Sequence, residues 1–300
     1  FDLYGIRTGF RMNRSLGMIP ATTRQERLVK PVFLSLLAII FTSTAFADNL
    51  SFAERVALGA QGEHRSEANK TRDQYRHPVE TLEFFGIEEG DTVMEIWPGG
   101  GWYTEILAPA MRDYGTLIIA TWDPEVEGQP AYRYELPKKM EETFEQHPEV
   151  YDQVIFEYFS PPESPSLGEA ESLDAIVTFR NTHGWISAGQ AKDIFNEFAR
   201  VLKPGGILGV VQHRADEGSD PKVSAKQGYV SEAAVKKLAA NAGLEFVAGS
   251  EINANPKDTK DHPKGVWTLP PSYSLGDQDK EKYAAIGESD RMTLRFRKTR

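Results

Sequence analysis

Apolar and polar positions alternate along most of the chain with two different periodicities. Short runs rich in Val and Ile are typical of buried strands, whereas apolar positions three and four apart are typical of amphipathic helices. The runs that predict strands are residues 92–96, 116–120, 154–159, 174–179, 207–212, 244–252 and 292–297. The segments that predict helices are residues 78–85, 103–114, 137–144, 188–201 and 231–242, and residues 51–75 are polar and compatible with a helix.

The order of these elements predicts the fold class. Strands and helices that alternate at these lengths form an α/β domain, in which a mainly parallel sheet carries helices on both faces. We therefore expect a Rossmann-like, doubly wound architecture. Ligands of such sheets bind beside the carboxyl ends of the strands. Four loops are then expected along one edge: residues 97–101, Asp123, residues 180–183 and residues 212–214.

The first of these loops follows an apolar run that ends in an acid and continues into glycines, from Val93 to Gly101. Glycine lacks a β-carbon, so Gly99, Gly100 and Gly101 let a ligand approach the main chain, and the next helix presents free amides at its start. A dehydrogenase loop would need a glycine at position 104, which is Thr104, so a nicotinamide cofactor is disfavoured. A ligand site is expected just after residue 96.

Glu95 lies between the apolar residues Met94 and Ile96 at the end of the first strand. Its carboxylate is either a ligand acceptor or a surface group. Burial between apolar neighbours favours the first interpretation, because an unpaired buried charge is costly.

The loops after the fourth and fifth strands contain the catalytic candidates. His183 is a candidate general base, because an ordinary imidazole titrates near neutral pH, and Asn181 is a candidate for orienting an acceptor. A structural histidine and a loop-fixing asparagine are the alternatives. His213 and Arg214 are expected to form a second wall of the same cleft.

Two other segments have an open interpretation. Arg76 and His77 either cap and pack a helix or cover the pocket, and the apolar segment Gly265–Ser272 either closes over an acceptor or forms a small cluster of its own. The six histidines show no metal-binding spacing, so no metal is expected.

Composition narrows the class of partner. The chain has 300 residues, 40% hydrophobic and 26% charged, which is typical of a globular protein with one main domain. Six basic and two acidic side chains in residues 1–47 leave a formal charge of −14 on residues 48–300, within a total of −10. Such an acidic body repels phosphate backbones and anionic lipids, so small molecules are better partners than nucleic acid. The absence of cysteine excludes disulfides and a thiolate nucleophile.

The first 47 residues are typical of an N-terminal extension with a secretory signal. Basic residues precede the apolar stretch 31–41, and Ala45-Phe46-Ala47 has the small-x-small pattern of a cleavage site. The apolar stretch is shorter than the roughly 20 residues that span a bilayer. We expect cleavage after Ala47, a periplasmic or secreted chain of residues 48–300, and no stable membrane insertion afterwards. An uncleaved anchor and a buried helix are the alternatives.

Several motifs together carry a family resemblance. Residues 86–95, the glycine loop and Leu202-Lys-Pro-Gly-Gly206 resemble class I S-adenosylmethionine-dependent methyltransferases. Residues 97–109 and 265–271 look more narrowly like a bacterial subgroup of predicted, often exported, methyltransferase-like proteins, with similarity over residues 63–300. The resemblance implies a seven-stranded sheet with an antiparallel last strand. It also implies S-adenosylmethionine as cofactor, with Glu95 beside its methionine end, Gly99 to Gly101 facing it, and Asp123 on the ribose.

The sequence departs from the family pattern at Trp97, which stands where the first glycine of the loop is usual. The indole either crowds the methionine moiety or forms a wall of the cofactor pocket. As a wall it would stack on the ligand or lie near the sulfonium, where a cation–π contact is worth about 0.5–2 kcal/mol. The expected function is methyl transfer to a small or medium acceptor. A non-catalytic exported binding protein is the alternative, and a protein-interaction module is a weaker one. The acceptor and the oligomeric state do not follow from the residues.

Overall fold

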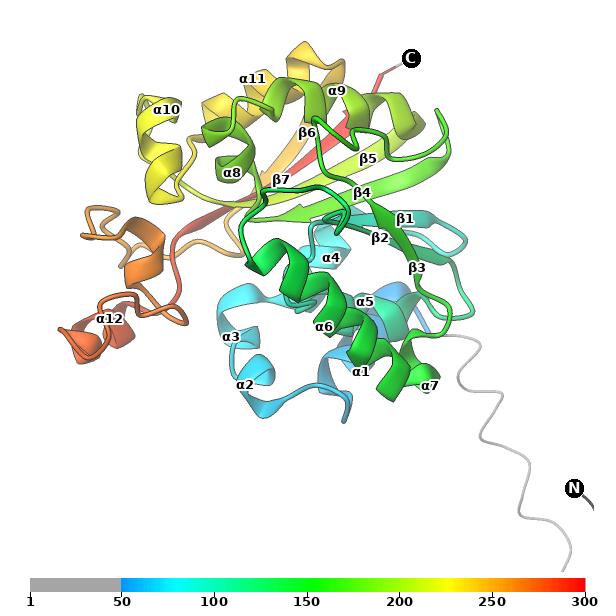
Figure 1. Ribbon diagram of the computed structural model, residues 1–300, viewed down its shortest axis with the longest axis horizontal. Helices are drawn as coiled ribbons and strands as arrows, with labels where there is room; N and C mark the ends of the chain where they lie inside the picture. The colour runs from blue at the N-terminus through cyan, green and yellow to red at the C-terminus, as the bar shows by residue number, and fades with distance from the viewer. Residues whose placement is uncertain (1–49, 300) are drawn as a thin grey trace, which may run out of the picture. The chain divides into compact units, whose positions relative to one another are not determined.

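The computed structural model describes residues 50–299, and these form one seven-stranded sheet (Figure 1). Its strand order is β3-β2-β1-β4-β5-β7-β6. Only β7 runs antiparallel to its neighbours, β5 and β6, among the described strands. The predicted fold class is therefore confirmed, including the antiparallel last strand. The strands are β1 Thr92–Ile96, β2 Thr116–Thr121, β3 Ile155–Tyr158, β4 Leu173–Phe179, β5 Leu202–His213, β6 Leu244–Ser250 and β7 Arg291–Lys298.

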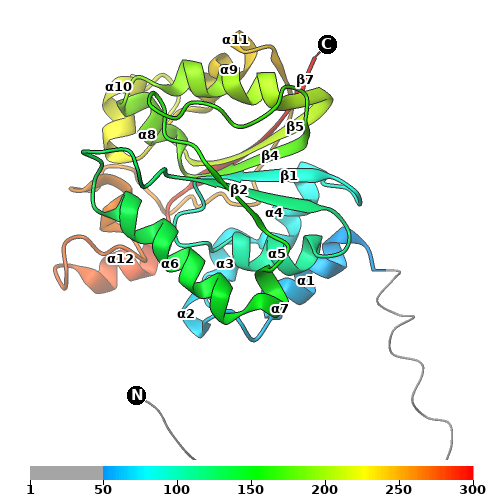
Figure 2. The ribbon, with the colours of Figure 1, turned by 45° about the vertical axis from the view of Figure 1, so that its right-hand side comes forward.

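Helices cover both faces of the sheet, as Figures 1 and 2 show from two directions. One face carries α1 Phe52–Gln61, α4 Pro78–Phe85 and α5 Thr104–Met111, and the other carries α8 Thr182–Ser187, α9 Ala191–Val201 and α11 Glu232–Asn241. Each face buries its own apolar cluster against the strands. The remaining helical segments are α2 Glu67–Lys70, α3 Asp73–Arg76, α6 Tyr132–Gln146, α7 Pro148–Tyr151, α10 Pro221–Ser224, η2 Ala225–Gln227, η3 Gly265–Thr268 and α12 Lys280–Ile286.

Local sequence explains where several helices begin and end. Pro78 occupies the first position of α4, and Gly86 closes the helix in the left-handed conformation, as the sequence predicts. Ser231 caps α11 by accepting a hydrogen bond from the amide of Ala234. These caps fix the ends of helices that lead into or out of the sheet.

Some boundaries differ from the predicted ones. Residues 182–187 form α8, although the sequence favours a loop there, because Gly184 and the short length hide the helical pattern. Helix α5 ends at Met111 instead of continuing to residue 114, with Arg112 in an extended conformation. Strand β5 begins at Leu202, earlier than the predicted residue 207, and its pairing with β4 changes register between Leu173 and Ala175.

The fold brings the expected loops to one edge of the sheet. Trp97 follows β1, Asp123 lies just past β2, and Arg180 follows β4. Because β7 is antiparallel, its first residue lies at this edge too, with Arg291 opposite His213 of β5. The connection from β6 to β7, which contains η3 and α12, lies at the same edge (orange in Figures 1 and 2).

The expected signal segment and its cleavage after Ala47 lie outside the described residues. Within residues 50–299, no helix is long and apolar enough to cross a membrane. No group of three or more metal-binding side chains occurs in that part of the chain either.

Candidate functional site

The glycine loop after β1 is a tight turn that faces open space. Gly99 and Gly101 adopt positive φ angles of 64° and 78°, which favour glycine. A β-carbon added to Gly99 or Gly100 would meet no atom within 4 Å. The turn is closed by a hydrogen bond from the Gly101 amide to the Pro98 carbonyl, 3.1 Å apart. The main chain is therefore accessible to a ligand at Gly99 and Gly100, as the sequence predicts.

Glu95 lies beneath this loop with only 1% of its surface exposed. One of its carboxylate oxygens accepts a hydrogen bond of 2.6 Å from the hydroxyl of Thr104, in the first turn of α5. Burial raises the pKa of Glu95 to about 7, against the opposing effects of Thr104 and of the charge on Arg180. The carboxyl group is buried as expected, and it connects the end of β1 to α5.

The indole of Trp97 belongs to a packed aromatic cluster. Its ring lies 5.4 Å from that of Trp122, 5.7 Å from Trp185 and 6.3 Å from Phe159, centroid to centroid. Its Nε1 donates to the carbonyl of Phe159 at 2.8 Å, and the residue is 5% exposed. The guanidinium of Arg133 lies 5.1 Å from the ring centroid. We call Trp97, Trp122, Phe159 and Trp185 the indole cluster.

The direction of this indole bears on the two alternatives for Trp97. The cluster lies on the face of α8 and α9, whereas the glycine loop continues into α5 on the other face. No atom of Trp97 lies within 4 Å of the open positions at Gly99 and Gly100. The side chain therefore fills space on the β2–β3 side of the loop and leaves the space in front of the two glycines free.

Asp123 lies at the expected edge, between the loops after β2 and β3. Its carboxylate accepts a hydrogen bond of 2.9 Å from the amide of Glu125, and its own amide donates to the hydroxyl of Ser160 at 2.7 Å. The side chain is half-buried. The carboxylate therefore shapes its own turn at this edge of the sheet.

The side-chain amide of Asn181 is already engaged by the backbone. Its Nδ2 lies 2.8 Å from the carbonyl oxygen of Ile96, 3.2 Å from that of Trp97 and 3.1 Å from the hydroxyl of Thr178. The donor group thus joins the turn after β4 to the turn after β1. This geometry corresponds to the loop-fixing alternative.

His183 and His213 are brought together, with ring centroids 5.9 Å apart. Burial lowers the pKa of His183 to about 4, although a contact with Gln212 opposes the shift, and Arg180 lowers it further. Burial and the charges of Arg291 and Arg180 hold the pKa of His213 well below its ordinary value. Both imidazoles are therefore neutral at pH 7 and able to accept a proton.

His213 lines a small cavity of about 70 Å³, which we call the rim cavity, and the ring of His183 lies 5.7 Å from that of Trp267, another lining residue. Residues from β4, β5, the start of β7 and the β6–β7 connection line it: Arg180, His213, Val266, Trp267, Pro270, Pro271, Ser272, Glu288, Ser289 and Arg291. Val266, Trp267, Pro270, Pro271 and Ser272 line the cavity, and we call residues 265–272 the cover segment. Val266 also packs with Ala215 and Tyr229 in a small apolar cluster, so the structure agrees with both interpretations of this motif. Gly265 is required there, because a β-carbon would lie 2.1 Å from the carbonyl oxygen of Gln227.

A buried ion-pair cluster, absent from the sequence predictions, lies beside the rim cavity. The carboxylate of Glu288 pairs with Arg72 at 2.6 Å, with Arg76 at 3.1 Å and with Arg291. Burial alone would raise the pKa of Glu288, but the three guanidinium groups outweigh it and hold the pKa well below its usual range. Arg76 is a buried member of this cluster and packs over the ring of Trp102, and His77 occupies the N-cap position of α4, which agrees with the capping and packing alternative for this pair.

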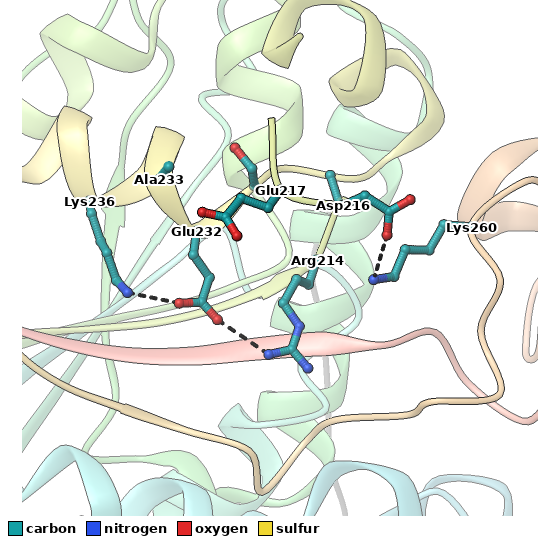
Figure 3. A pocket seen from close by; sticks show the side chains of 9 residues that line it. Arg214, Asp216, Glu217, Glu232, Ala233, Lys236 and Lys260 are labelled. Carbon is teal, nitrogen blue, oxygen red and sulfur yellow. Dashed lines mark hydrogen bonds and ion pairs between the residues drawn. The ribbon is translucent and has the colours of Figure 1, made fainter. Parts of the chain in front are cut away.

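Arg214 does not share a wall with His213, contrary to the sequence expectation. Successive side chains of a strand point to opposite faces. Arg214 lines a separate cavity of about 530 Å³ and pairs with Glu232, Glu251 and Asp290. Figure 3 shows this cavity, in which Lys236 pairs with Glu232 and Lys260 with Asp216. Its charges neutralise one another, which suits a structural network.

Comparison with known proteins bears on the fold. No protein-family model matches the chain, and no curated protein matches it. Solved structures do match its arrangement of strands and helices. A geranyl diphosphate C-methyltransferase from Streptomyces coelicolor A3(2), solved with Mg²⁺, geranyl diphosphate and S-adenosyl-L-homocysteine, is 16% identical with a TM-score of 0.51. The match covers 80% of this chain and 87% of that one.

Two further structures are similar. A protein assigned provisionally as a sarcosine dimethylglycine methyltransferase from Galdieria sulphuraria is 16% identical, with a TM-score of 0.51 over 82% of this chain and 98% of that one. The chain has the fold of the class I methyltransferases. The [4+2]-cyclase SpnF is 17% identical, with a TM-score of 0.50 over 83% of this chain and 93% of that one. At these identities the class I fold is shared, and the reaction must be argued from the site.

Proposed function

We propose that the chain transfers a methyl group from S-adenosylmethionine to a small or medium acceptor. The proposal is carried by one observation: in a class I methyltransferase fold, the turn directly after β1 has Gly99 at a positive φ, and both Gly99 and Gly100 face open space. Structures of this fold include methyltransferases that were solved with the demethylated cofactor product.

The residues that would hold the cofactor lie on three neighbouring loops. The main chain at Gly99 and Gly100 would face it, Asp123 would accept from its ribose hydroxyls, and Glu95 would lie beside its methionine end. The indole of Trp97 would form a wall of the pocket on the β2–β3 side, since it leaves the space at Gly99 and Gly100 free. When bound, the cofactor supplies an electrophilic methyl group.

Residues of this chain would position the acceptor, exclude water and accept a proton. Holding an acceptor in line with the donor supplies most of the rate acceleration, because it replaces a bimolecular encounter by a fixed geometry. The cover segment of residues 265–272 would exclude water from the rim cavity. His183 and His213 are neutral and would take a proton from an acceptor that loses one, and a negative charge bound nearby would raise their lowered pKa values and make them stronger bases.

Isothermal titration calorimetry of the purified chain with S-adenosylmethionine and S-adenosylhomocysteine tests the proposal. Both compounds are expected to bind, and Asp123→Ala is expected to weaken the binding of both. Asp193→Ala, a change of the same kind on an exposed position of α9, is the matched control. A folded sample that binds neither compound would end the methyltransferase proposal.

A second candidate function is favoured by the position of Trp97. A bulky residue stands where the family has its first glycine, and it is only 5% exposed within the indole cluster. A non-catalytic binding protein that retains the class I fold explains this residue without a need for turnover. Binding of an adenosyl compound without any methyl transfer to candidate acceptors would favour this function over the first.

We also propose that the chain acts outside the cytosol, because residues 31–47 have the pattern of a secretory signal. Cell fractionation is expected to find the protein in the periplasm or the medium, with an N-terminus at Asp48. Recovery of the uncleaved chain from the cytosol would contradict this location.

A further inference from the structure

The rim cavity has more positive than negative charge around it. Arg72, Arg76 and Arg291 share the single carboxylate of Glu288. Arg180 lines the same cavity, and no carboxylate of the described residues forms an ion pair with it. Four guanidinium groups therefore face one carboxylate.

Several donors in this cluster are buried without a partner. Arg76 is 1% exposed and Arg291 is 2% exposed. Among the described residues, both terminal nitrogens of Arg76 and the Nε of Arg291 have no hydrogen-bond acceptor. Both guanidinium groups share the Glu288 carboxylate, so part of their charge and these donors stay uncompensated, which is costly in a buried site because arginine does not lose its proton at neutral pH. The cluster is thus incomplete as it stands.

Nearby acids do not supply the missing charge. Burial raises the pKa of Glu95 to about 7, and its carboxyl group is already bonded to Thr104. Asp290 lies next in sequence to the cavity, but it pairs with Arg214 and Lys260. The excess positive charge therefore remains at the cavity itself.

We propose that the rim cavity binds one anionic group of the acceptor, a carboxylate or a phosphate, between Arg180 and Arg291. The inference rests on the proposed function and adds the class of substrate to it. The cavity of about 70 Å³ exceeds severalfold the roughly 10–15 Å³ that one water molecule needs. The guanidinium fork of Arg180 matches a carboxylate or phosphate with two parallel hydrogen bonds. Arg291 adds its unpaired Nε, since its two terminal nitrogens already donate to the Tyr75 carbonyl and to Glu288.

The position of the cavity favours the acceptor over the methyl donor. Arg180 follows β4 and Arg291 begins β7, whereas the glycine loop follows β1 and Asp123 follows β2. The cavity also contains His213, whose ring lies 5.9 Å from that of His183. An acceptor anchored here by its anionic group would place its remaining atoms beside both imidazoles. A bound anion would also raise the pKa values of both histidines, which makes them stronger bases with substrate in place.

Anion binding is tested without the cofactor. The purified chain is titrated with inorganic phosphate and with acetate, and binding is followed by calorimetry and by ³¹P NMR for phosphate. We expect saturable binding that Arg180→Gln weakens by at least about tenfold, as loss of a charged hydrogen-bond partner implies. Arg112→Gln removes the same charge from an exposed pair with Asp152 on another part of the domain, and it is expected to leave anion affinity unchanged.

Two further variants keep the test decisive. Arg180→Lys keeps the charge but loses the fork, so an intermediate affinity is expected even if Arg180→Gln folds poorly. Glu288→Gln removes the competing carboxylate and is expected to tighten anion binding. No saturable binding by the folded wild-type chain, or equal weakening in Arg112→Gln, would overturn the inference.

A competition experiment separates the source of the anionic group. Phosphate is titrated into the chain in the presence of S-adenosylhomocysteine. Independent binding of the two supports an acceptor site, whereas mutual exclusion assigns the arginines to the carboxylate of the donor and overturns the inference. Cofactor binding without phosphate binding would reject the anion site alone. Phosphate binding without cofactor binding would reject the proposed function and retain an anion-binding protein.

Discussion

The side-chain amide of Asn181 donates a hydrogen bond to the backbone carbonyl of Trp97, 3.2 Å away. The same nitrogen lies 2.8 Å from the carbonyl of Ile96, so the turn after β4 holds the turn after β1. Both turns contain a non-glycine residue in the left-handed region, Trp97 with φ 47° and Arg180 with φ 67°. Such residues are strained and persist only where their surroundings fix them. The hydrogen bonds of Asn181 are one such constraint.

We therefore expect Asn181→Ala to lower the free energy of unfolding by about 1–3 kcal/mol, since it leaves buried carbonyl groups without a donor. Asn181→Asp keeps the size of the side chain but lacks the amide donor, and it is expected to lose a similar amount. Urea denaturation measures both. An unchanged unfolding midpoint in both variants would show that the two turns are held by other contacts.

Substitution of Trp97 distinguishes two roles of its indole, which either forms a wall of the cofactor pocket or obstructs that pocket. Trp97→Gly restores the family glycine but empties the indole cluster, so we expect a loss of stability of about 3–5 kcal/mol. If the indole is a wall, the affinity for S-adenosylhomocysteine falls. Trp185→Phe disturbs the same cluster away from the loop and is the control, with affinity expected to stay near the wild-type value. Tighter binding by Trp97→Gly would assign the indole to obstruction of the pocket.

The pKa of His183 in the folded chain is expected to be about 4, because the imidazole is buried and lies near Arg180. An unfolded histidine titrates near 6.5. Below pH 6.5 the imidazole is protonated in the unfolded chain but not in the folded chain. The free energy of unfolding therefore decreases progressively as the pH falls from about 6.5 to about 4. NMR titration of the imidazole, assigned with His183→Gln, measures the pKa. A value at or above 6.5 would contradict the buried, neutral state.

Glu288→Gln is expected to destabilise the chain by about 3–5 kcal/mol at neutral pH, because it leaves three guanidinium groups without their carboxylate. The pKa of Glu288 is lowered in the fold, so its contribution is present above the ordinary pKa of a glutamate and is lost as the pH falls towards the lowered value. Glu251→Gln removes a largely exposed partner of Arg214, and a change within about 1 kcal/mol is expected. Equal decreases in the free energy of unfolding in the two variants would show that the burial of Glu288 does not strengthen its ion pairs.

Sequence patterns predicted the strands and the edge of the sheet well, because each depends on local alternation. The burial of Glu95 followed from its apolar neighbours in β1. The separation of His213 from Arg214 was also within reach, since adjacent strand residues point to opposite faces.

Local sequence patterns could not predict the cluster of arginines around Glu288. Arg76 and Glu288 are 212 positions apart, and only the antiparallel β7 brings them together. Their local spacing offers a weak hint, because Arg72 and Arg76 are four apart and Glu288 and Arg291 are three apart. Such pairs are common on solvated helix surfaces, so the hint becomes specific only with the three-dimensional structure.

The β6–β7 connection, which Gly265 holds close to Gln227, lines one side of the rim cavity, whereas Arg180, His213 and Arg291 line it from the ends of strands. The sequence and length of this connection can therefore vary among related chains without a change in the residues at the strand ends. A longer or shorter β6–β7 connection would change the size of molecule admitted without shifting a single strand register. Chains that share this sheet and its arginines, but differ in that connection, are then expected to prefer acceptors with the same charged end and different bodies.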